Sequence, residues 1–291
     1  MESQLNNFMY VYMYHLENYL LSKKEEIKGI SFQSDEANTD RPLKEYMKNL
    51  IEKDFNKIPQ NSNIKLLNIE SKQCEDMEVL QSFKINKVLL PENITQDIKE
   101  HIVNLKAISS VYTNPDLCFE ITSCESKYWV TIELKSTKNN SIPGSSIQQI
   151  TPDEWVIFIK HKNESIDIVT GKYINSINYK MQFPDRSPRP DVSFKELKDW
   201  NKKYRIFYNE ELKYLTDENS NKKFDLISDW QKVLADRWVN MLFECNTIKS
   251  KEPWFNNNMR KFILEFLNKY DSLSTDEQIA FKVKIQNLIT K

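Results

Sequence analysis

The sequence predicts an α/β fold, in which helices flank a central mixed β-sheet and a helical C-terminal region follows. Apolar residues recur with helical spacing in the first 60 residues and again after residue 193, whereas alternating and continuously apolar runs lie mainly between them. Such a pattern is typical of a sheet whose faces are both covered by helices. With 291 residues the chain can bury a large core. We expect one domain over residues 1–291, with its core at about 41–180 and the helical region at about 193–291.

Amphipathic helices are expected at three places before the main strands, namely residues 5–28, 41–57 and 95–109. Pro42 stands at the start of the second helix, where a residue without an N–H group is tolerated. A further helix is expected from Ser193, because serine is a good N-cap and Glu196 completes a capping box. Helical spacing then continues along two apolar faces, Trp230, Leu234, Trp238 and Met241, and Phe262, Ile263, Phe266, Leu267 and Tyr270.

Several runs have the pattern of strands. Residues 155–160 are nearly all apolar, which predicts a central strand buried on both faces. Residues 165–169 and 172–177 are predicted to be two strands around a turn at Gly171. Residues 116–122 and 128–135 alternate between apolar and other side chains, which predicts the two arms of a β-hairpin.

The hairpin is the most informative feature of the chain. In its second arm alternate residues face inward (Tyr128, Val130, Ile132, Leu134) and outward (Trp129, Thr131, Glu133, Lys135). In its first arm Leu117, Phe119 and Ile121 face inward, and Asp116, Cys118, Glu120 and Thr122 face outward. One register sets Asp116 directly across from Glu133 with Cys124-Glu125 as a two-residue turn. The alternative register shifts the pairing and lengthens the loop, because these two residues are poor for a primed turn.

Both registers bring Asp116, Glu133 and Lys135 close together on one face. Two neighbouring carboxylates repel each other unless a cation lies between them. Magnesium prefers oxygen ligands and keeps several waters, so it suits a pair of carboxylates. Lys135 would position or deprotonate a water and stabilise charge that develops on a phosphate. These groups together predict metal-assisted hydrolysis of a phosphodiester.

Pro115-Asp116 followed by Glu133-Leu134-Lys135 resembles the PD-(D/E)XK nuclease motif, best known from type II restriction endonucleases. The motif covers a small part of the chain, and its specificity comes from the matching faces of the hairpin. The resemblance implies a restriction-endonuclease-like domain in which Asp116 and Glu133 hold Mg²⁺ and Lys135 acts on the attacking water. It implies the carbonyl of Leu134 as a further ligand.

Further site residues are expected around this motif. Glu45 lies on an early helix, where nucleases of this family often supply an additional acid, and Glu120 shares the face of Asp116. Ser145, Ser146, Gln148 and Gln149 follow the catalytic strand, where similar enzymes approach DNA, and such side chains bind phosphates or adenine edges. Arg186 and Arg189 stand in a proline-stiffened segment, and arginine is the commonest reader of guanine.

Composition excludes several other classes of function. The three glycines, Gly29, Gly144 and Gly171, exclude the glycine-rich loops that bind nucleotide cofactors. The four cysteines show no C-x-x-C spacing, which argues against a zinc site or a disulfide framework and indicates a reducing compartment. The apolar run 8–21 contains Glu17 and is neither a signal peptide nor a membrane span. We therefore expect a cytoplasmic protein. A net charge of −1 argues against nonspecific coating of nucleic acid but allows a local basic cleft.

The function that the sequence predicts best is a magnesium-dependent, site-specific endonuclease for double-stranded DNA, as in a restriction–modification system. If its target is a palindrome, a two-fold homodimer is expected. One alternative is a repair or defence nuclease directed by DNA structure or modification. An alternative of another class is a noncatalytic interaction module, whose hairpin carries only a solvated, salt-bridged face.

Overall fold

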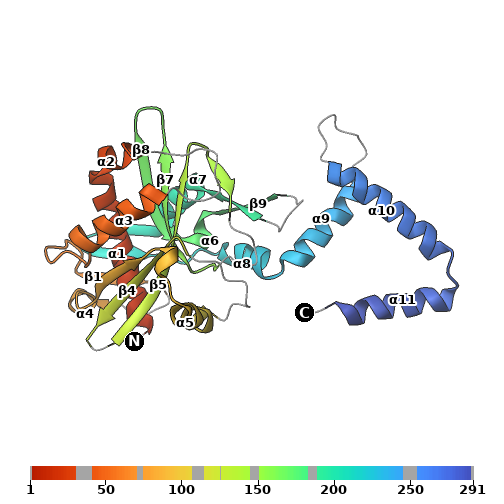
Figure 1. Ribbon diagram of the computed structural model, residues 1–291, viewed down its shortest axis with the longest axis horizontal. Coiled ribbons are helices and arrows are strands. Elements are labelled where there is room, and N and C mark those ends of the chain that lie inside the picture. Colours follow the sequence, from red (N-terminus) through yellow and green to blue (C-terminus); the bar gives the residue numbers. More distant parts are fainter. Residues whose placement is uncertain are drawn as a thin grey trace. The chain divides into compact units, whose positions relative to one another are not determined.

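A computed structural model describes residues 2–30, 41–70, 75–106, 115–124, 126–144, 151–182, 189–244 and 254–289 (Figure 1). The described residues form two compact units that divide between Ser228 and Asp229. The division falls inside the region 193–291, which the sequence pattern groups together. The first unit contains the predicted hairpin, and the second contains only helices among its described residues.

The helices of the first unit are α1 (Glu2–Ser22), α2 (Lys24–Lys28), α3 (Arg41–Asp54), α4 (Met77–Leu80), η1 (Pro91–Asn93), α5 (Gln96–Lys106), α6 (Tyr173–Ser176), α7 (Phe194–Tyr204) and α8 (Ser220–Ser228). Its strands are β1 (Leu66–Ile69), β2 (Glu75–Asp76), β3 (Lys84–Leu89), β4 (Leu117–Ser123), β5 (Ser126–Thr137), β6 (Ser141–Pro143), β7 (Trp155–His161), β8 (Ile166–Lys172), β9 (Ile177–Gln182), β10 (Arg189–Ser193), β11 (Arg205–Tyr208) and β12 (Glu211–Tyr214). The second unit has α9 (Trp230–Glu244), α10 (Trp254–Asp271) and α11 (Thr275–Leu288).

The strands that the structure describes form three sheets (Figure 1). The largest has the order β3-β4-β5-β7-β8, in which β5 and β7 run parallel and the other neighbours run antiparallel. The smaller sheets have the orders β11-β12-β1-β2 and β6-β10-β9. The predicted central mixed sheet is therefore confirmed.

Helices cover both faces of the largest sheet. On one face α1 lies against β8, where the hydroxyl of Thr170 donates to the carbonyl of Met13 over 2.9 Å. On the other face α7 lies against β7 and β8, and the ring of Phe194 contacts that of Phe158 edge-on at 5.7 Å. Strand β7 is paired on both sides and its first five residues are buried, so the prediction of a central strand is confirmed.

Gly171 does not form the predicted turn. It lies within β8, which runs unbroken to Lys172, and α6 then separates β8 from β9. A Cβ atom at position 171 would lie 2.7 Å from Cδ1 of Leu197 in α7. A larger residue here would force the buried side chain of Leu197 to shift, so glycine accommodates the close approach of the helix to the sheet, which is a second common use of glycine in strands.

The expectation of helices throughout residues 193–291 was also wrong in one place. The capped helix is present, and Oγ of Ser193 accepts from the backbone N–H of Glu196. After it β11 and β12 form a hairpin whose turn, Asn209 and Glu210, has φ of 47° and 62°. Both turn residues are left-handed, as a type I′ hairpin turn requires, but only Asn209 is a residue type that favours this conformation.

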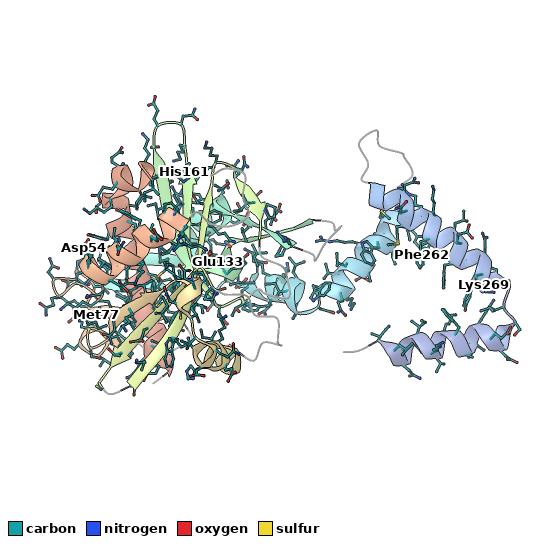
Figure 2. The ribbon with its side chains drawn as sticks, in the orientation of Figure 1. Asp54, Met77, Glu133, His161, Phe262 and Lys269 are labelled. Carbon is teal, nitrogen blue, oxygen red and sulfur yellow. The ribbon has the colours of Figure 1, made fainter. Side chains whose placement is uncertain are left out.

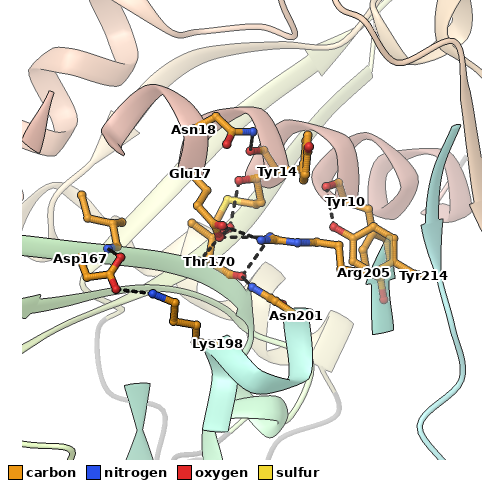
Figure 3. A network of polar contacts seen from close by, with 12 residues as sticks. Tyr10, Tyr14, Glu17, Asn18, Asp167, Thr170, Lys198, Asn201, Arg205 and Tyr214 are labelled. Carbon is orange, nitrogen blue, oxygen red and sulfur yellow. Dashed lines mark hydrogen bonds and ion pairs between the residues drawn. The ribbon is translucent and has the colours of Figure 1, made fainter. Parts of the chain in front are cut away.

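A buried ion pair ties the two sides of the sheet together (Figure 3). Nη2 of Arg205 lies 2.5 Å from Oε1 of Glu17 in α1. The same carboxylate accepts from the backbone N–H of Thr170, over 2.6 Å, and the amide of Asn201 in α7 donates to the Thr170 carbonyl over 2.9 Å. This network joins α1, β8, α7 and β11 around the strand that carries Thr170.

Candidate active site

Strands β4 and β5 form the predicted hairpin. Their ladder runs from Leu117 paired with Ile132 to Ser123 paired with Ser126, which confirms the register with the short turn. Asp116 therefore lies one position beyond the ladder, across from Glu133. Cys124 has a φ of 53°, the left-handed conformation that a primed turn needs at its first position.

Asp116 is held by groups from two other elements. Its Oδ2 accepts from the backbone N–H of Leu134 over 2.9 Å, and its Oδ1 lies 2.7 Å from Nζ of Lys44 in α3. The side chains of Asp116 and Lys44 are only 14% and 15% exposed. Both carboxylate oxygens thus have a positive or hydrogen-bonding partner in a largely shielded position.

Glu133 and Lys135 contact each other along β5. Nζ of Lys135 lies 2.6 Å from Oε1 of Glu133, and the two side chains are 13% and 14% exposed. Residues i and i+2 of a strand share a face, so the pair lies on the face predicted from the alternation. Glu133 is labelled within the first unit in Figure 2.

The pKa of Lys135 is raised above its ordinary value. Burial by itself lowers the pKa, but the charges of Glu133, Tyr173 and Asp116 and the hydrogen bond to Glu133 outweigh this effect. Lys135 is therefore an ammonium group at neutral pH. The short contact of Lys135 with Glu133 and the register that sets Asp116 across from Glu133 bring the three residues together.

Pro115 limits the ladder beside the site. In the observed register Pro115 lies across from Leu134. The N–H of Leu134 points toward β4, since it donates to Asp116, and its carbonyl projects from the same edge of the strand. A proline has no N–H and so cannot donate to this carbonyl. Asp116 thus supplies the acceptor for the N–H of Leu134, and Pro115 is not a donor to its carbonyl.

Helix α3 is docked on the edge strand β3 by two side chains. Nζ of Lys48 donates to the carbonyl of Val88 over 2.8 Å, and Oε1 of Glu52 accepts from the N–H of Val88 over 2.8 Å. Lys48 and Glu52 also form an ion pair with each other. The two side chains satisfy both backbone groups of Val88, as a further strand would, and they fix the rotation of α3 about its axis.

This rotation brings Lys44 to Asp116, and Glu45 points elsewhere. Oε1 of Glu45 lies 2.8 Å from Nε of Arg41 at the exposed start of α3. Successive helical residues are about 100° apart around the axis, so the sequence could not tell which of the two neighbours faces the site. The helix residue that contacts Asp116 is thus the cationic Lys44 and not the expected acid Glu45. Nothing in the residue spacing of α3 predicts this.

Glu120 lies on the same face of β4 as Asp116 but pairs with a different lysine. Its Oε1 lies 3.3 Å from Nζ of Lys127. Between these acids Cys118 is fully buried against Ile102 of α5. The predicted faces are therefore correct, but the face expected to be solvated is covered by α5 over part of its length.

The remaining predicted DNA contacts are only partly described. Arg189 is the first residue of β10, where it pairs with Gln182 of β9 and is half-buried. Arg186 and the group Ser145, Ser146, Gln148 and Gln149 lie outside the described residues. Tyr173, which the sequence pattern assigned to a strand, begins α6, and its hydroxyl would lie 2.7 Å from a Cβ at Gly144.

The donor set fits a magnesium ion. Asp116, the residue before β4, and Glu133 in β5 offer two carboxylates, and the Leu134 carbonyl lies on the edge of β5 that faces Asp116. Within the described residues no group of three or more His, Cys, Asp and Glu side chains is arranged to hold a metal. A site with two carboxylates therefore needs water or substrate oxygens to complete its shell, which is how magnesium is usually bound.

Comparison with known proteins yields no relative. None of the protein-family models, curated proteins or solved structures compared with the chain matches it. Among the described helices, none has both the length and the apolar character needed to cross a membrane. A functional proposal must therefore come from the side chains around the hairpin.

Proposed function

We propose that this chain is a magnesium-dependent endonuclease that hydrolyses phosphodiester bonds in double-stranded DNA at specific sites. The observation that carries the proposal is the gathering of Asp116, Glu133 and Lys135 at the end of the β4–β5 ladder. Two carboxylates from neighbouring strands and one ammonium group are a suitable set for metal-assisted hydrolysis of a phosphodiester.

Each residue has a distinct role in this proposal. Asp116 and Glu133 would hold the ion, and the carbonyl of Leu134 would add a third oxygen. A bound magnesium ion supplies Lewis acidity toward a phosphodiester. The ammonium group of Lys135 would donate hydrogen bonds to the attacking water and to the phosphate oxygen that gains charge in the transition state.

The protein would act in the cytoplasm as a type II restriction enzyme of a restriction–modification system. The resemblance of Pro115-Asp116 and Glu133-Leu134-Lys135 to the PD-(D/E)XK motif supports this class, and so does the position of the motif on a hairpin of a mixed sheet. A two-fold homodimer would match a palindromic target. Arg189 is the described residue that we assign to the DNA contact.

Cleavage of unmethylated plasmid DNA tests the proposal. With Mg²⁺ the wild type should produce discrete fragments, and with a chelator it should produce none. Glu133→Gln and Lys135→Met should each reduce cleavage by about 100-fold or more, because each removes a group that acts in the transition state. Equal cleavage by the wild type and both variants would refute the assignment.

The chain contains a close control for these substitutions. The sequence Glu-Leu-Lys of residues 133–135 occurs again as Glu211-Leu212-Lys213 in strand β12. Leu212 is buried in the same core as Leu134. The residues across from Glu211 in its sheet are Tyr208 and Leu66, so no second carboxylate stands there as Asp116 stands across from Glu133. Lys213→Met should leave magnesium-dependent cleavage unchanged.

Two competing functions make different predictions in the same assay. A nuclease directed by DNA structure or modification should cut branched or modified substrates and give no discrete fragments from ordinary plasmid. A noncatalytic module is favoured by one observation, that each carboxylate already has a lysine partner. Such a module should cut none of these substrates with any divalent metal.

A further inference from the structure

Lys44 introduces a second ammonium group into the proposed metal site. Its Nζ lies 2.7 Å from Oδ1 of Asp116, and solvent reaches little of either side chain. The other oxygen of Asp116 accepts from the N–H of Leu134. Oδ1 is therefore the oxygen that an incoming cation would share or take over.

The position of Lys44 is built into the fold. Leu43 and Met47 are buried in the core on one side of α3, and Lys48 is tied to the carbonyl of Val88 on the sheet edge. Lys44 precedes Lys48 by four residues, so the two lysines lie on the same face of the helix, one turn apart. The contact of Lys44 with Asp116 thus follows from the docking of α3 against β3 and the core.

We infer that Lys44 is the counter-ion of Asp116 in the metal-free protein. A divalent cation that binds Oδ1 of Asp116 must displace the ammonium group of Lys44 from that oxygen. The inference rests on the proposed metal site. A cation bound to Oδ1 and an ammonium group 2.7 Å from the same oxygen would repel each other strongly in a place that is poorly screened by water. Lys44 therefore keeps the ionised Asp116 compensated before metal binds, and it lowers the affinity of the site for metal.

Lys44 differs in this respect from Lys135. Lys135 stands on the same strand as Glu133 and belongs to the motif, and the proposed function already gives it a role. Lys44 comes from another element and contacts the other carboxylate. It is thus a positioning residue whose removal changes the strength of metal binding before any substrate is present.

Metal titration without DNA tests the inference. The binding of Mg²⁺ and Mn²⁺ is measured by calorimetry and by thermal shift for the wild type and for Lys44→Met. We expect the variant to bind the metals about fivefold to tenfold more tightly, as the loss of one well-shielded ion pair predicts. Lys53→Met is the matched control, because Lys53 is an exposed residue of the same helix. The affinity of this variant for both metals should equal that of the wild type.

Unchanged or weaker binding by Lys44→Met would overturn the inference. If Lys44→Met binds metal more tightly than the wild type but the wild type does not cut DNA, the proposed function fails and the inference stands. If the wild type cuts DNA and Lys44→Met binds metal no more tightly, the inference fails alone. If neither protein binds either metal, both are wrong.

A double-mutant cycle in the presence of a chelator gives a second, metal-free test. Lys44→Met should lower the melting temperature, because it leaves the carboxylate of Asp116 without its counter-ion. In an Asp116→Asn background the same substitution should have little effect. If the two substitutions lower the melting temperature additively, the ion pair does not couple the residues and the inference is wrong.

Discussion

The backbone N–H of Leu134 donates to Oδ2 of Asp116 over 2.9 Å, at the place where the β4–β5 ladder ends. The carboxylate of Asp116 thus has two roles. It takes the place of a backbone acceptor for Leu134, and it is part of the candidate metal site. Substitutions of Asp116 will therefore affect stability and metal binding by different mechanisms. The two effects can be separated because the hydrogen bond needs only an oxygen, whereas metal binding and the ion pair with Lys44 need a negative charge.

Asp116→Asn and Asp116→Ala should differ in stability. Both substitutions remove the charge that pairs with Lys44, but asparagine retains an oxygen that can accept from Leu134, so we expect it to cost about 1 kcal/mol less than alanine. Alanine leaves this shielded N–H without its acceptor and Lys44 without a partner, and should cost about 2–3 kcal/mol. Urea denaturation with a chelator measures the difference, and both variants should lose magnesium-dependent cleavage.

The same pair of substitutions at Glu120 serves as a control. Glu120 lies on the same face of β4, but its carboxylate pairs with the side chain of the half-exposed Lys127. Glu120→Gln and Glu120→Ala should therefore differ by less than about 0.5 kcal/mol. Equal losses for Asn and Ala at position 116 would show that the hydrogen bond to Leu134 contributes nothing measurable.

The hairpin could be predicted from the sequence because its information is local. Alternation assigned the faces of both arms, and the observed pairing of Leu117 with Ile132 is one of the two registers that alternation allows. The apolar run of β7 likewise marked a strand with neighbours on both sides. These features follow from the period of two of a strand, which one pass along the chain reveals.

The remainder depended on contacts between distant elements. The choice of Lys44 over Glu45 is made by Lys48 and Glu52, which bind Val88 and so fix the rotation of α3. The use of glycine at position 171, within β8, is explained by the approach of α7, which follows it by about 25 residues. No local pattern records such docking. Sequence reasoning therefore found the motif of the candidate site and missed the helix residue that completes it.

The turn of the hairpin offers a test of its backbone conformation. Cys124 has a φ of 53°, which is strained for most side chains but common for asparagine. Cys124→Asn should raise the stability by about 0.5 kcal/mol, and the β-branched Cys124→Val should lower it by about 1 kcal/mol. Thermal unfolding measures both. Ser123, in the extended strand, is the control, and there valine should be tolerated better than asparagine. If asparagine and valine rank in the same order of stability at positions 123 and 124, the turn conformation of Cys124 is wrong.

Removal of one partner of the Arg205–Glu17 ion pair should strongly reduce the stability of the fold (Figure 3). Arg205→Met leaves a shielded carboxylate with only Thr170 to stabilise it. We expect a loss of about 3–5 kcal/mol in the free energy of unfolding, measured by urea denaturation. Adding Glu17→Gln should recover a large part of this loss, because the second change removes the uncompensated charge.

The exposed pair of Lys195 with Asp199 provides the contrast. Its atoms are also 2.5 Å apart, but both side chains lie largely in solvent. Lys195→Met should leave the free energy of unfolding almost unchanged, because solvent screens an exposed pair. Similar losses for Lys195→Met and Arg205→Met would mean that burial does not determine the contribution of these pairs.

The stability of the first unit should fall in mild acid because of His15. Burial lowers the pKa of this histidine from 6.5 to about 4, and its Nε2 lies 2.9 Å from Oγ of Ser62. Between these pH values the unfolded chain binds a proton that the folded protein does not. The free energy of unfolding therefore decreases as the pH falls from 6.5 to about 4, by at most roughly 3 kcal/mol. Urea denaturation at a series of pH values measures the decrease.

His15→Gln should flatten this pH dependence, because glutamine can still bond to Ser62 but does not titrate. Part of the slope should remain, since burial and the charge of Lys138 also lower the pKa of His161 and act in the same direction. A slope that is the same in the wild type and in His15→Gln would mean that His15 is protonated as readily in the folded protein as in the unfolded chain.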